Sequence, residues 1–239
     1  MQNALIKLPF LFVLVIFSAS GVPAGQLNDE LRHADSLFAE KKFTQSLERY
    51  EHLLSQGYES PAMLLRMAYI EEGLQQYARA LYYLNRYYRL HPDKMVWQKI
   101  AALAAQQKLS GYDMSLFWHG VSVYRVKRVQ AVLINLAVVA VIAVMLWLYR
   151  KPVVKRSLIV LQIFAVGLLL LQLNMRLPQF AIVAENGVPV MSGPSAGADV
   201  VGRVDSGNRL KVLGRADVWV KVADRNLTGY IRSANLLLL

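Results

Sequence analysis

The sequence contains no cysteine among its 239 residues. Disulfide bonds, thiolate metal sites, a cysteine nucleophile and lipid attachment at an N-terminal cysteine are therefore excluded. The absence of cysteine is compatible with oxidising and with reducing compartments, so it does not place the protein in either.

Motifs typical of enzymes are also missing. There is no glycine loop that could hold a phosphate, no nucleophile elbow and no zinc motif. The four histidines stand at no metal-ligand spacing: His33, His52, His91 and His119. We therefore expect a protein that is not an enzyme, with no catalytic residue, no cofactor and no metal site.

The formal net charge of +11 is unevenly distributed. Eleven Lys and Arg between Gly25 and Tyr124 are balanced by eleven Asp and Glu, and the segment from Ala181 to Leu239 has seven cations against five anions. The other nine cations flank hydrophobic runs. Nucleic-acid binding would need a basic face on a folded domain. The distribution excludes nucleic acid as a partner and indicates a membrane.

The N-terminal residues 1–24 are typical of a signal peptide. Lys7 precedes an apolar run from Leu8 to Phe17, which small residues follow. This run is short for a bilayer span and typical of secretory signals. Cleavage is expected after Ala24 or after Ser20, and an uncleaved anchor is the alternative. Both place the following chain outside the cytoplasm.

Two long uncharged runs predict a membrane hairpin. Residues 129–149 and 157–175 contain 21 and 19 residues, and each covers the roughly 30 Å hydrocarbon core as a helix. The link, residues 150–156, contains Pro152 and four cations. Short basic loops stay in the cytoplasm, so the link is expected inside and both flanking regions outside. Arg125, Lys127 and Arg128 oppose this rule, and the signal peptide decides the topology.

The hairpin predicts which residues face each other. Asn135 and Gln172 are nearly equidistant from Val153, so two antiparallel helices bring them to the same depth. We expect their amides to form a hydrogen bond, the alternative being that both reach water. Ala140 stands level with Ala165 and Gly167, small residues that permit close helix packing.

Residues 25–110 show helical spacing with a period of 34 residues. Phe43 aligns with Tyr77 and Ser46 with Ala80, and the alanines at 34, 68 and 102 recur at the same interval. The pattern resembles the tetratricopeptide repeat, with two repeats at 27–58 and 61–92 and a first helix of a third from about Met95. Ser46 stands where the family usually has alanine, which implies looser packing. On the second helix, Tyr77, Ala80, Leu84 and Tyr87 are expected to face the core.

The resemblance to this repeat also implies a groove for a protein partner, lined by the first helix of each repeat. In this sequence the corresponding residues are Asn28, Asp35, Leu65, Tyr69, Glu72, Lys99 and Gln106. The basic and asparagine clamp that some members use for a C-terminal carboxylate is absent.

After a juxtamembrane segment (111–128) and the hairpin, residues 176–239 show short alternating strands and turns. Six strands are expected: 180–185, 188–192, 199–204, 209–215, 218–223 and 228–233. The stretches "VVGRVDSGNRLKVLG" and "GYIRSANL" make this region similar to bacterial SH3-type domains. Trp219 and Tyr230 are its aromatic anchors, in the core or rim or else in contact with a ligand. Relatives of this type bind cell-wall peptides or proteins.

The fold class is thus a multidomain membrane protein: an all-α tetratricopeptide repeat, a transmembrane helical hairpin and an all-β SH3-like barrel. This order resembles the BatE-like proteins of bacterial aerotolerance operons. The resemblance implies partners among von Willebrand factor A-type Bat proteins and a MoxR-type ATPase, at the periplasmic side of the inner membrane. We expect a non-enzymatic scaffold. The alternatives are a cell-wall anchor that binds peptidoglycan through the SH3-like domain and a transmembrane sensor.

Overall fold

The computed structural model describes residues 24–113, 116–149, 151–175, 177–224 and 227–239. The chain divides into two compact units, Met1–Tyr58 and Glu59–Leu239. The predicted signal peptide lies outside the described residues, apart from Ala24.

The first unit is a pair of helices, α1 (Ala24–Ala39) and α2 (Phe43–Ser55). Leu47, Tyr50 and Leu53 of α2 are buried. Ser46 is also fully buried, and its hydroxyl donates to the Ala34 carbonyl oxygen at 2.9 Å. The hydroxyl therefore has a partner inside the core, and the looser packing expected at this serine stays a prediction.

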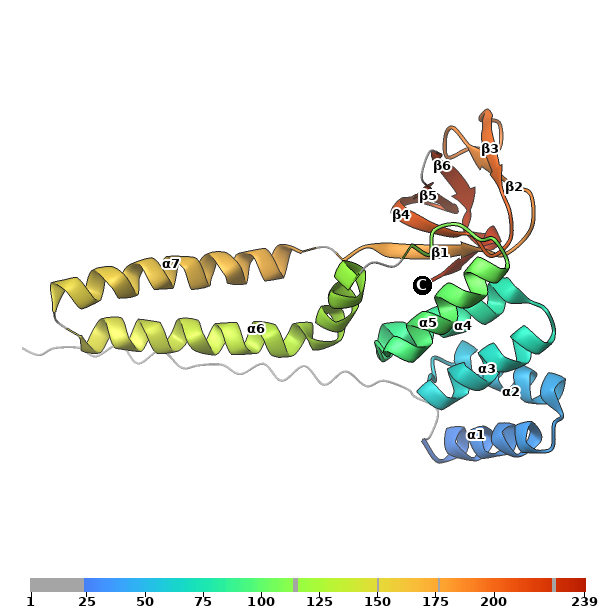
Figure 1. Ribbon diagram of the computed structural model, residues 1–239, viewed down its shortest axis with the longest axis horizontal. Helices are drawn as coiled ribbons and strands as arrows, with labels where there is room; N and C mark the ends of the chain where they lie inside the picture. Colours follow the sequence, from blue (N-terminus) through green and yellow to red (C-terminus); the bar gives the residue numbers. More distant parts are fainter. Residues whose placement is uncertain (1–23, 114–115, 150, 176, 225–226) are drawn as a thin grey trace, which may run out of the picture. The chain divides into compact units, whose positions relative to one another are not determined.

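The second unit begins with three helices, α3 (Pro61–Gly73), α4 (Tyr77–Leu90) and α5 (Lys94–Gln106) (Figure 1). The Ser60 hydroxyl caps α3 by accepting from the Met63 N–H at 3.3 Å, and Pro61 occupies the first helical position. The Asp93 carboxylate caps α5 by accepting from the Met95 N–H at 2.9 Å. These residues satisfy N–H groups that a helix start leaves unpaired.

One turn geometry recurs at three helix ends. Lys41, Gln75 and Lys108 all have a positive φ, of 60°, 60° and 55°. The next residue in each case donates its N–H to a carbonyl five residues back: Lys42 to Leu37, Gln76 to Glu71 and Leu109 to Ala104. This is the hydrogen-bond pattern of a Schellman cap. The turns that end α1, α3 and α5 thus recur at intervals of 34 and 33 residues, close to the period of 34 residues found in the sequence.

The buried face of α4 differs in part from the predicted one. Ala80 and Leu84 are buried as expected, whereas Tyr77 and Tyr87 are only half-buried. The buried tyrosines are Tyr83 and Tyr88, because further elements pack on α4 and widen its covered face. Ala102, unlike the other two repeated alanines, is exposed. The next helix after α5 is the long helix α6 (Leu116–Leu148), which belongs to the apolar hairpin.

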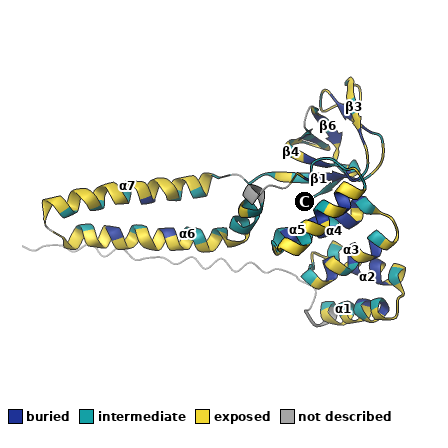
Figure 2. Cartoon of the chain, viewed as in Figure 1, coloured by how far each residue is buried: buried dark blue, intermediate teal, exposed yellow. Residues whose placement is uncertain are grey.

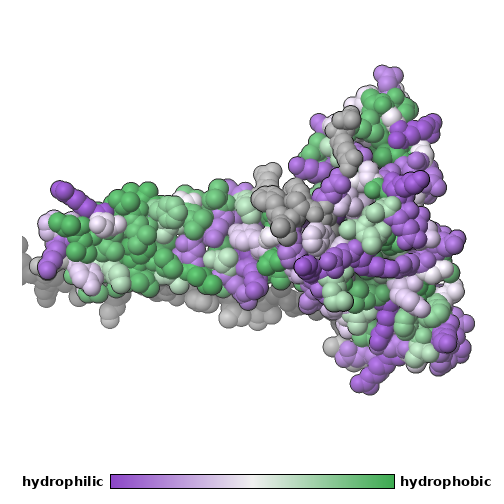
Figure 3. All heavy atoms as spheres, in the orientation of Figure 1, coloured by the Kyte–Doolittle hydropathy of each residue, from purple (hydrophilic) through white to green (hydrophobic). Residues whose placement is uncertain are grey.

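The helices α6 (Leu116–Leu148) and α7 (Pro152–Asn174) run side by side (Figure 1). They are about 50 Å and 35 Å long at 1.5 Å per residue. Their segments His119–Leu148 and Pro152–Asn174 are long and apolar enough to cross a membrane. Figure 2 shows most of their surface exposed, and Figure 3 shows it to be predominantly apolar.

Two boundaries of the predicted hairpin are wrong. The link is shorter than residues 150–156, because Pro152 occupies the first position of α7 and residues 153–156 form its first turn. Proline is favoured there, since its missing N–H would be unpaired in any case. The first helix also begins well before Val129, so much of the predicted juxtamembrane segment is helical.

The helices of the hairpin meet along residues spaced three and four apart, as antiparallel helices do when they pack at a small angle. On α6 the least exposed residues of this face are Asn135, Val139, Ile142 and Leu146, and on α7 they are Val154, Leu158, Gln162, Ala165, Leu169 and Gln172. The remaining surface of both helices is largely exposed.

The described part of the β-domain forms one antiparallel sheet in the order β3-β2-β6-β5-β4-β1-β7. Its strands are β1 (Gln179–Val183), β2 (Val188–Met191), β3 (Val200–Val204), β4 (Arg209–Ala216), β5 (Trp219–Ala223), β6 (Thr228–Arg232) and β7 (Leu236–Leu238). The six predicted strands are confirmed. The sequence did not predict β7, which pairs with β1. The core is aliphatic, with Val190, Leu210, Val220 and Ile231 among its buried residues.

Candidate functional site

The residues predicted to line a groove on α3 and α5 share an exposed surface. Leu65, Tyr69 and Glu72 stand four and three residues apart on α3, and Tyr69 is 61% exposed. Lys99 Nζ donates to Glu72 Oε1 at 2.5 Å, so the structure brings α3 and α5 together at this pair. Gln106 lies exposed two turns after Lys99. The surface combines an apolar part, an aromatic ring and a charged pair.

The two predicted groove residues of the first unit lie two turns apart on α1. Asn28 is exposed. Asp35 is half-buried, and its Oδ1 accepts a hydrogen bond from the Tyr50 hydroxyl at 2.7 Å. Asp35 therefore also joins α1 to α2.

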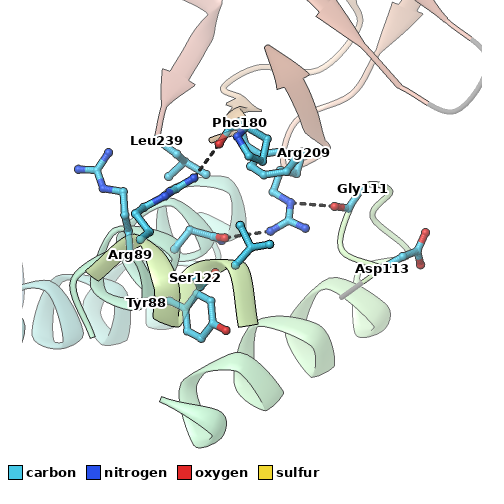
Figure 4. Close-up of a pocket in the computed structure, with 12 residues that line it drawn as sticks. Tyr88, Arg89, Gly111, Asp113, Ser122, Phe180, Arg209 and Leu239 are labelled. Atoms are coloured by element: carbon cyan, nitrogen blue, oxygen red, sulfur yellow. Dashed lines mark hydrogen bonds between the residues drawn. The ribbon is translucent and has the colours of Figure 1, made fainter. Parts of the chain in front are cut away.

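Arg209 connects the helices to the β-domain within the second unit. It begins β4, yet only 8% of its surface is exposed. Its Nε donates to the Gly111 carbonyl at 2.7 Å, and its Nη1 donates to Asn85 Oδ1 of α4 at 3.2 Å (Figure 4). Its guanidinium also lies 4.8 Å from the ring centres of both Tyr112 and Phe180. The planar, weakly hydrated guanidinium suits such a stacked and buried position.

The segment after α5 is held against the β-domain by its backbone. The Ser110 carbonyl accepts from the Arg209 N–H at 3.1 Å, and the Ser110 N–H donates to Asn208 Oδ1 at 2.7 Å. The Tyr112 hydroxyl donates to the Gly207 carbonyl at 2.8 Å. Gly111 has a φ of +84°, and a Cβ there would lie 1.9 Å from the Arg209 carbonyl oxygen. Only glycine fits this approach.

Burial determines the ionisation of this cluster. It lowers the pKa of Arg209, while the neighbouring Tyr112 and Asp113 act in the opposite direction. Burial raises the pKa of the Tyr112 hydroxyl, and the nearby Arg209 opposes this shift. Arginine starts from a very high pKa, so at neutral pH Arg209 is charged and Tyr112 is a neutral hydrogen-bond donor.

A cavity of about 140 Å³ lies beside Arg209 (Figure 4). Three cations line it, namely Arg89, Arg125 and Arg209, together with the carboxylate of Asp113. Arg125 of α6 donates through Nη2 to the Pro178 carbonyl at 2.7 Å. The start of the α6–α7 hairpin is thereby tied to the segment that enters β1.

The structure brings Asn135 and Gln172 together in the hairpin. Asn135 Nδ2 donates to Gln172 Oε1 at 3.1 Å. The expected approach at Ala140 is wrong, because Ala140 is exposed and a Cβ on Gly167 would meet open space. Of these three small residues only Ala165 is buried. Larger side chains, such as Ile142 and Leu169, lie on the same contact face as Ala165. The two helices therefore pack without small residues along most of the hairpin.

The aromatic anchors predicted for the β-domain lie at its rim. Trp219 and Tyr230 are both half-buried. Lys221 Nζ lies 5.7 Å from the centre of the Tyr230 ring, within the range of a cation–π contact. Because the core is aliphatic, these rings are not the central core residues.

Sequence reasoning missed Arg209. Strand alternation places it on the same face of β4 as Lys211, which is exposed. The pattern thus predicts a solvated arginine, and no motif near position 209 indicates burial. Within the described residues, no group of three or more His, Asp or Glu side chains could hold a metal ion.

The comparisons with known proteins identify the β-domain. Residues 186–236 match the family model described as Bacterial SH3 domain. Searches of curated proteins and of solved structures find no match for the chain. The matched residues extend from the turn before β2 to the first residue of β7, while β1 precedes them. The chain therefore carries a bacterial SH3 domain at its C-terminal side.

Proposed function

We propose that this protein is a non-enzymatic scaffold of the bacterial envelope, anchored by the α6–α7 hairpin, whose helical repeats hold a partner protein. The observation that carries the proposal is the Arg209 cluster, which joins helix α4 and the segment after α5 to the SH3 domain. A buried cluster of this kind keeps two surfaces in a fixed relation. Such rigidity suits a protein that presents a binding face.

The repeat-like helices supply the partner face. The turns at Lys41, Gln75 and Lys108 support a tetratricopeptide-type arrangement, because they recur at intervals of 34 and 33 residues. Leu65 and Tyr69 are exposed beside the charged pair Glu72–Lys99. Aromatic side chains are typical of the energetically important centre of a protein interface, and charged pairs are typical of its polar rim.

The topology that fits this role places the short link on the cytoplasmic side. Lys151, Lys155 and Arg156 flank the turn of the hairpin, as the positive-inside rule expects. The helical repeats and the SH3 domain then lie on the periplasmic side of the inner membrane. The partners implied by the resemblance to BatE-like proteins are von Willebrand factor A-type Bat proteins and a MoxR-type ATPase, in a response linked to stress or aerotolerance.

Site-specific photo-crosslinking in cells tests this function. A photoreactive residue at Tyr69 is expected to give a discrete adduct whose protein component is identified by mass spectrometry. The same residue at Met95, which is 75% exposed but outside the predicted groove, is the control. Equal adducts at both positions, or none at Tyr69, would contradict a partner on this surface.

A second candidate function is cell-wall binding, and the SH3 match favours it. The half-buried rings of Trp219 and Tyr230, with Lys221 beside Tyr230, would be the contact residues. Detergent-solubilised protein would then sediment with purified sacculi, and Tyr230→Ala would weaken this association. Sedimentation that is absent in the wild type, or unchanged in Tyr230→Ala and Trp219→Ala, argues against this function.

A further inference from the structure

A groove of about 960 Å³ lies where the end of α7 meets strand β4. Three cations line it: Arg128 from α6, and Lys211 and Arg215 from β4. Among the described residues that line this groove, none is Asp or Glu. The groove therefore has a positive charge that its own lining does not neutralise.

Strand β4 forms one wall of the groove and contributes two cations and an apolar side chain to it. The pairing of β4 with β5 shifts register between Val212 and Gly214, so Leu213 stands at a bulge of the strand, and Lys211, Leu213 and Arg215 all line the groove there. All three are exposed, Leu213 by 50%. Their partners on the neighbouring strands are uncharged, namely Phe180 and Ala223 beside Lys211 and Val220 beside Arg215. This wall of the groove thus combines two cations with an exposed leucine between them.

Arg128 forms the opposite side of the groove. Its Nη2 donates to the carbonyl oxygens of Gln172 at 3.0 Å and Leu173 at 3.2 Å. These carbonyls belong to the last turn of α7, which lacks intrahelical partners and attracts cations. Both bonds use the same nitrogen, so the guanidinium is held in place, and within the described residues no acceptor is found for Nε or Nη1.

The groove lies at the boundary of the apolar hairpin. The candidate span of α7 ends at Asn174, one of the groove residues, and Arg128 directly precedes the uncharged run of α6. Leu170, Leu171 and Leu173 are exposed on the adjoining part of α7. In a bilayer, acyl chains would cover these leucines while a headgroup would lie at the level of the three cations.

We propose that this groove binds the phosphate headgroup of an anionic phospholipid. The inference rests on the proposed membrane anchoring. Arg128 and Arg215 supply planar N–H donors for phosphate oxygens, Lys211 supplies a point charge, and Leu213 contacts the glycerol region. The site also gives a reason for Arg128 on the outer side of the hairpin, where the positive-inside rule disfavours cations.

The neighbouring cavity extends the same positive field. Pro178 lines both the groove and the cavity beside Arg209. That cavity adds the cations of Arg89, Arg125 and Arg209, beside the carboxylate of Asp113. Clustered charge of one sign raises the local concentration of the opposite charge, so the two hollows together favour anionic over zwitterionic lipid.

The test is native mass spectrometry of the full chain, released from neutral detergent in the presence of phosphatidylglycerol or phosphatidylcholine with identical acyl chains. The wild type is expected to retain phosphatidylglycerol selectively. Lys211→Gln/Arg215→Gln should weaken this binding by roughly 30-fold, since each cation near a lipid surface contributes about a factor of five. Lys211→Arg/Arg215→Lys keeps both charges and should retain most of the affinity.

The matched control is Lys127→Gln/Arg232→Gln, which removes two exposed cations outside the groove. Retained selectivity in this control, with loss in the groove variant, supports the site. Equal loss in both variants, or no selectivity in the wild type, overturns it. Displacement of the lipid by millimolar inorganic phosphate also overturns the lipid assignment in favour of a soluble anion.

Membrane insertion is measured separately by carbonate extraction of cell membranes. A protein that resists extraction but shows no lipid selectivity contradicts the lipid site and leaves the anchoring proposal intact. A protein that carbonate releases contradicts the anchoring itself, and with it the lipid site.

Discussion

Asn135 and Gln172 are joined side chain to side chain at 3.1 Å, although 37 residues separate them. Asn135 is buried and faces α7, and the carbonyl of Gln172 accepts from Arg128 at the same level. The amide pair and the arginine thus fix the register of the two helices near the end of α7. An amide pair in lipid contributes only about 0.6 kcal/mol on average, so the register also depends on the wider contact face.

Cysteine pairs test this register directly, because the chain has no cysteine of its own. Asn135→Cys/Gln172→Cys is expected to form a disulfide efficiently under mild oxidant, which a mobility shift on reducing and non-reducing gels detects. Ala140→Cys/Gly167→Cys is the control, since Ala140 is exposed and Gly167 faces open space. Faster cross-linking of the control pair would contradict the register.

Arg209→Met is expected to loosen the SH3 domain from the helices. The change removes two hydrogen bonds and leaves the Gly111 carbonyl and the Asn85 amide oxygen without this donor. The expected cost is about 2–4 kcal/mol, mainly from unpaired buried polar groups. Limited proteolysis should then cleave the segment between α5 and α6 faster. Arg232→Met, at an exposed position, is the control and should leave the cleavage rate unchanged.

Gly111→Ala and Gly57→Ala form a matched pair. Both glycines have nearly the same φ, +84° and +83°, but a Cβ at Gly57 meets nothing within 4 Å. Gly57→Ala should therefore cost only the strain of a left-handed residue, about 1–2 kcal/mol. Gly111→Ala also forces a Cβ against the Arg209 carbonyl and should cost more than about 3 kcal/mol or prevent folding. Similar melting temperatures for the two variants would contradict this close approach.

Burial of the Tyr112 hydroxyl should make the stability of the protein decrease at alkaline pH. Its folded pKa is raised by burial, whereas an unfolded tyrosine ionises near pH 10. The neutral hydroxyl therefore stabilises the fold fully below about pH 10, and this contribution decreases as the pH rises further, because only the unfolded state releases the proton. Tyr112→Phe should flatten the decline in melting temperature between about pH 10 and 12.

Absorbance at 295 nm gives the companion measurement for Tyr112. The folded wild type and folded Tyr112→Phe should show the same tyrosine ionisation near pH 10, because Tyr112 does not ionise there in the folded state. A smaller amplitude in the variant would mean that the hydroxyl of Tyr112 titrates freely, and the pH argument would then be wrong.

The proposed topology is tested by single introduced cysteines at exposed positions. Met95→Cys and Val200→Cys should react with a membrane-impermeant maleimide in cells whose outer membrane is permeabilised, if one is present. Val153→Cys, 75% exposed on the first turn of α7, should react only after lysis. Labelling of position 153 alone in intact cells would reverse the topology.

Local pattern was sufficient for the helices, most strands and the hairpin. The helical runs, the turn residues and the alternation of the β-domain are properties of neighbouring residues, and they fix the element types. The pairing of Asn135 with Gln172 followed from the equal rise per residue along two joined helices, which requires only a count of residues from the turn. The exact helix ends were missed where a proline at position 152 could start a helix as well as interrupt one.

Tertiary contacts decided the rest. The sequence itself determined that Arg209 lies on a strand next to a turn, and alternation placed it on the solvent face. Its burial depends on Asn85 and Gly111, which are 124 and 98 residues away along the chain. Strand β7 likewise depends on β1 for its hydrogen-bond partners, since its run of leucines has no alternation. The periodicity of a helix or strand can be read from neighbouring residues. Whether a polar side chain such as Arg209 is buried depends on elements that are distant in the sequence and meet only when the chain has folded.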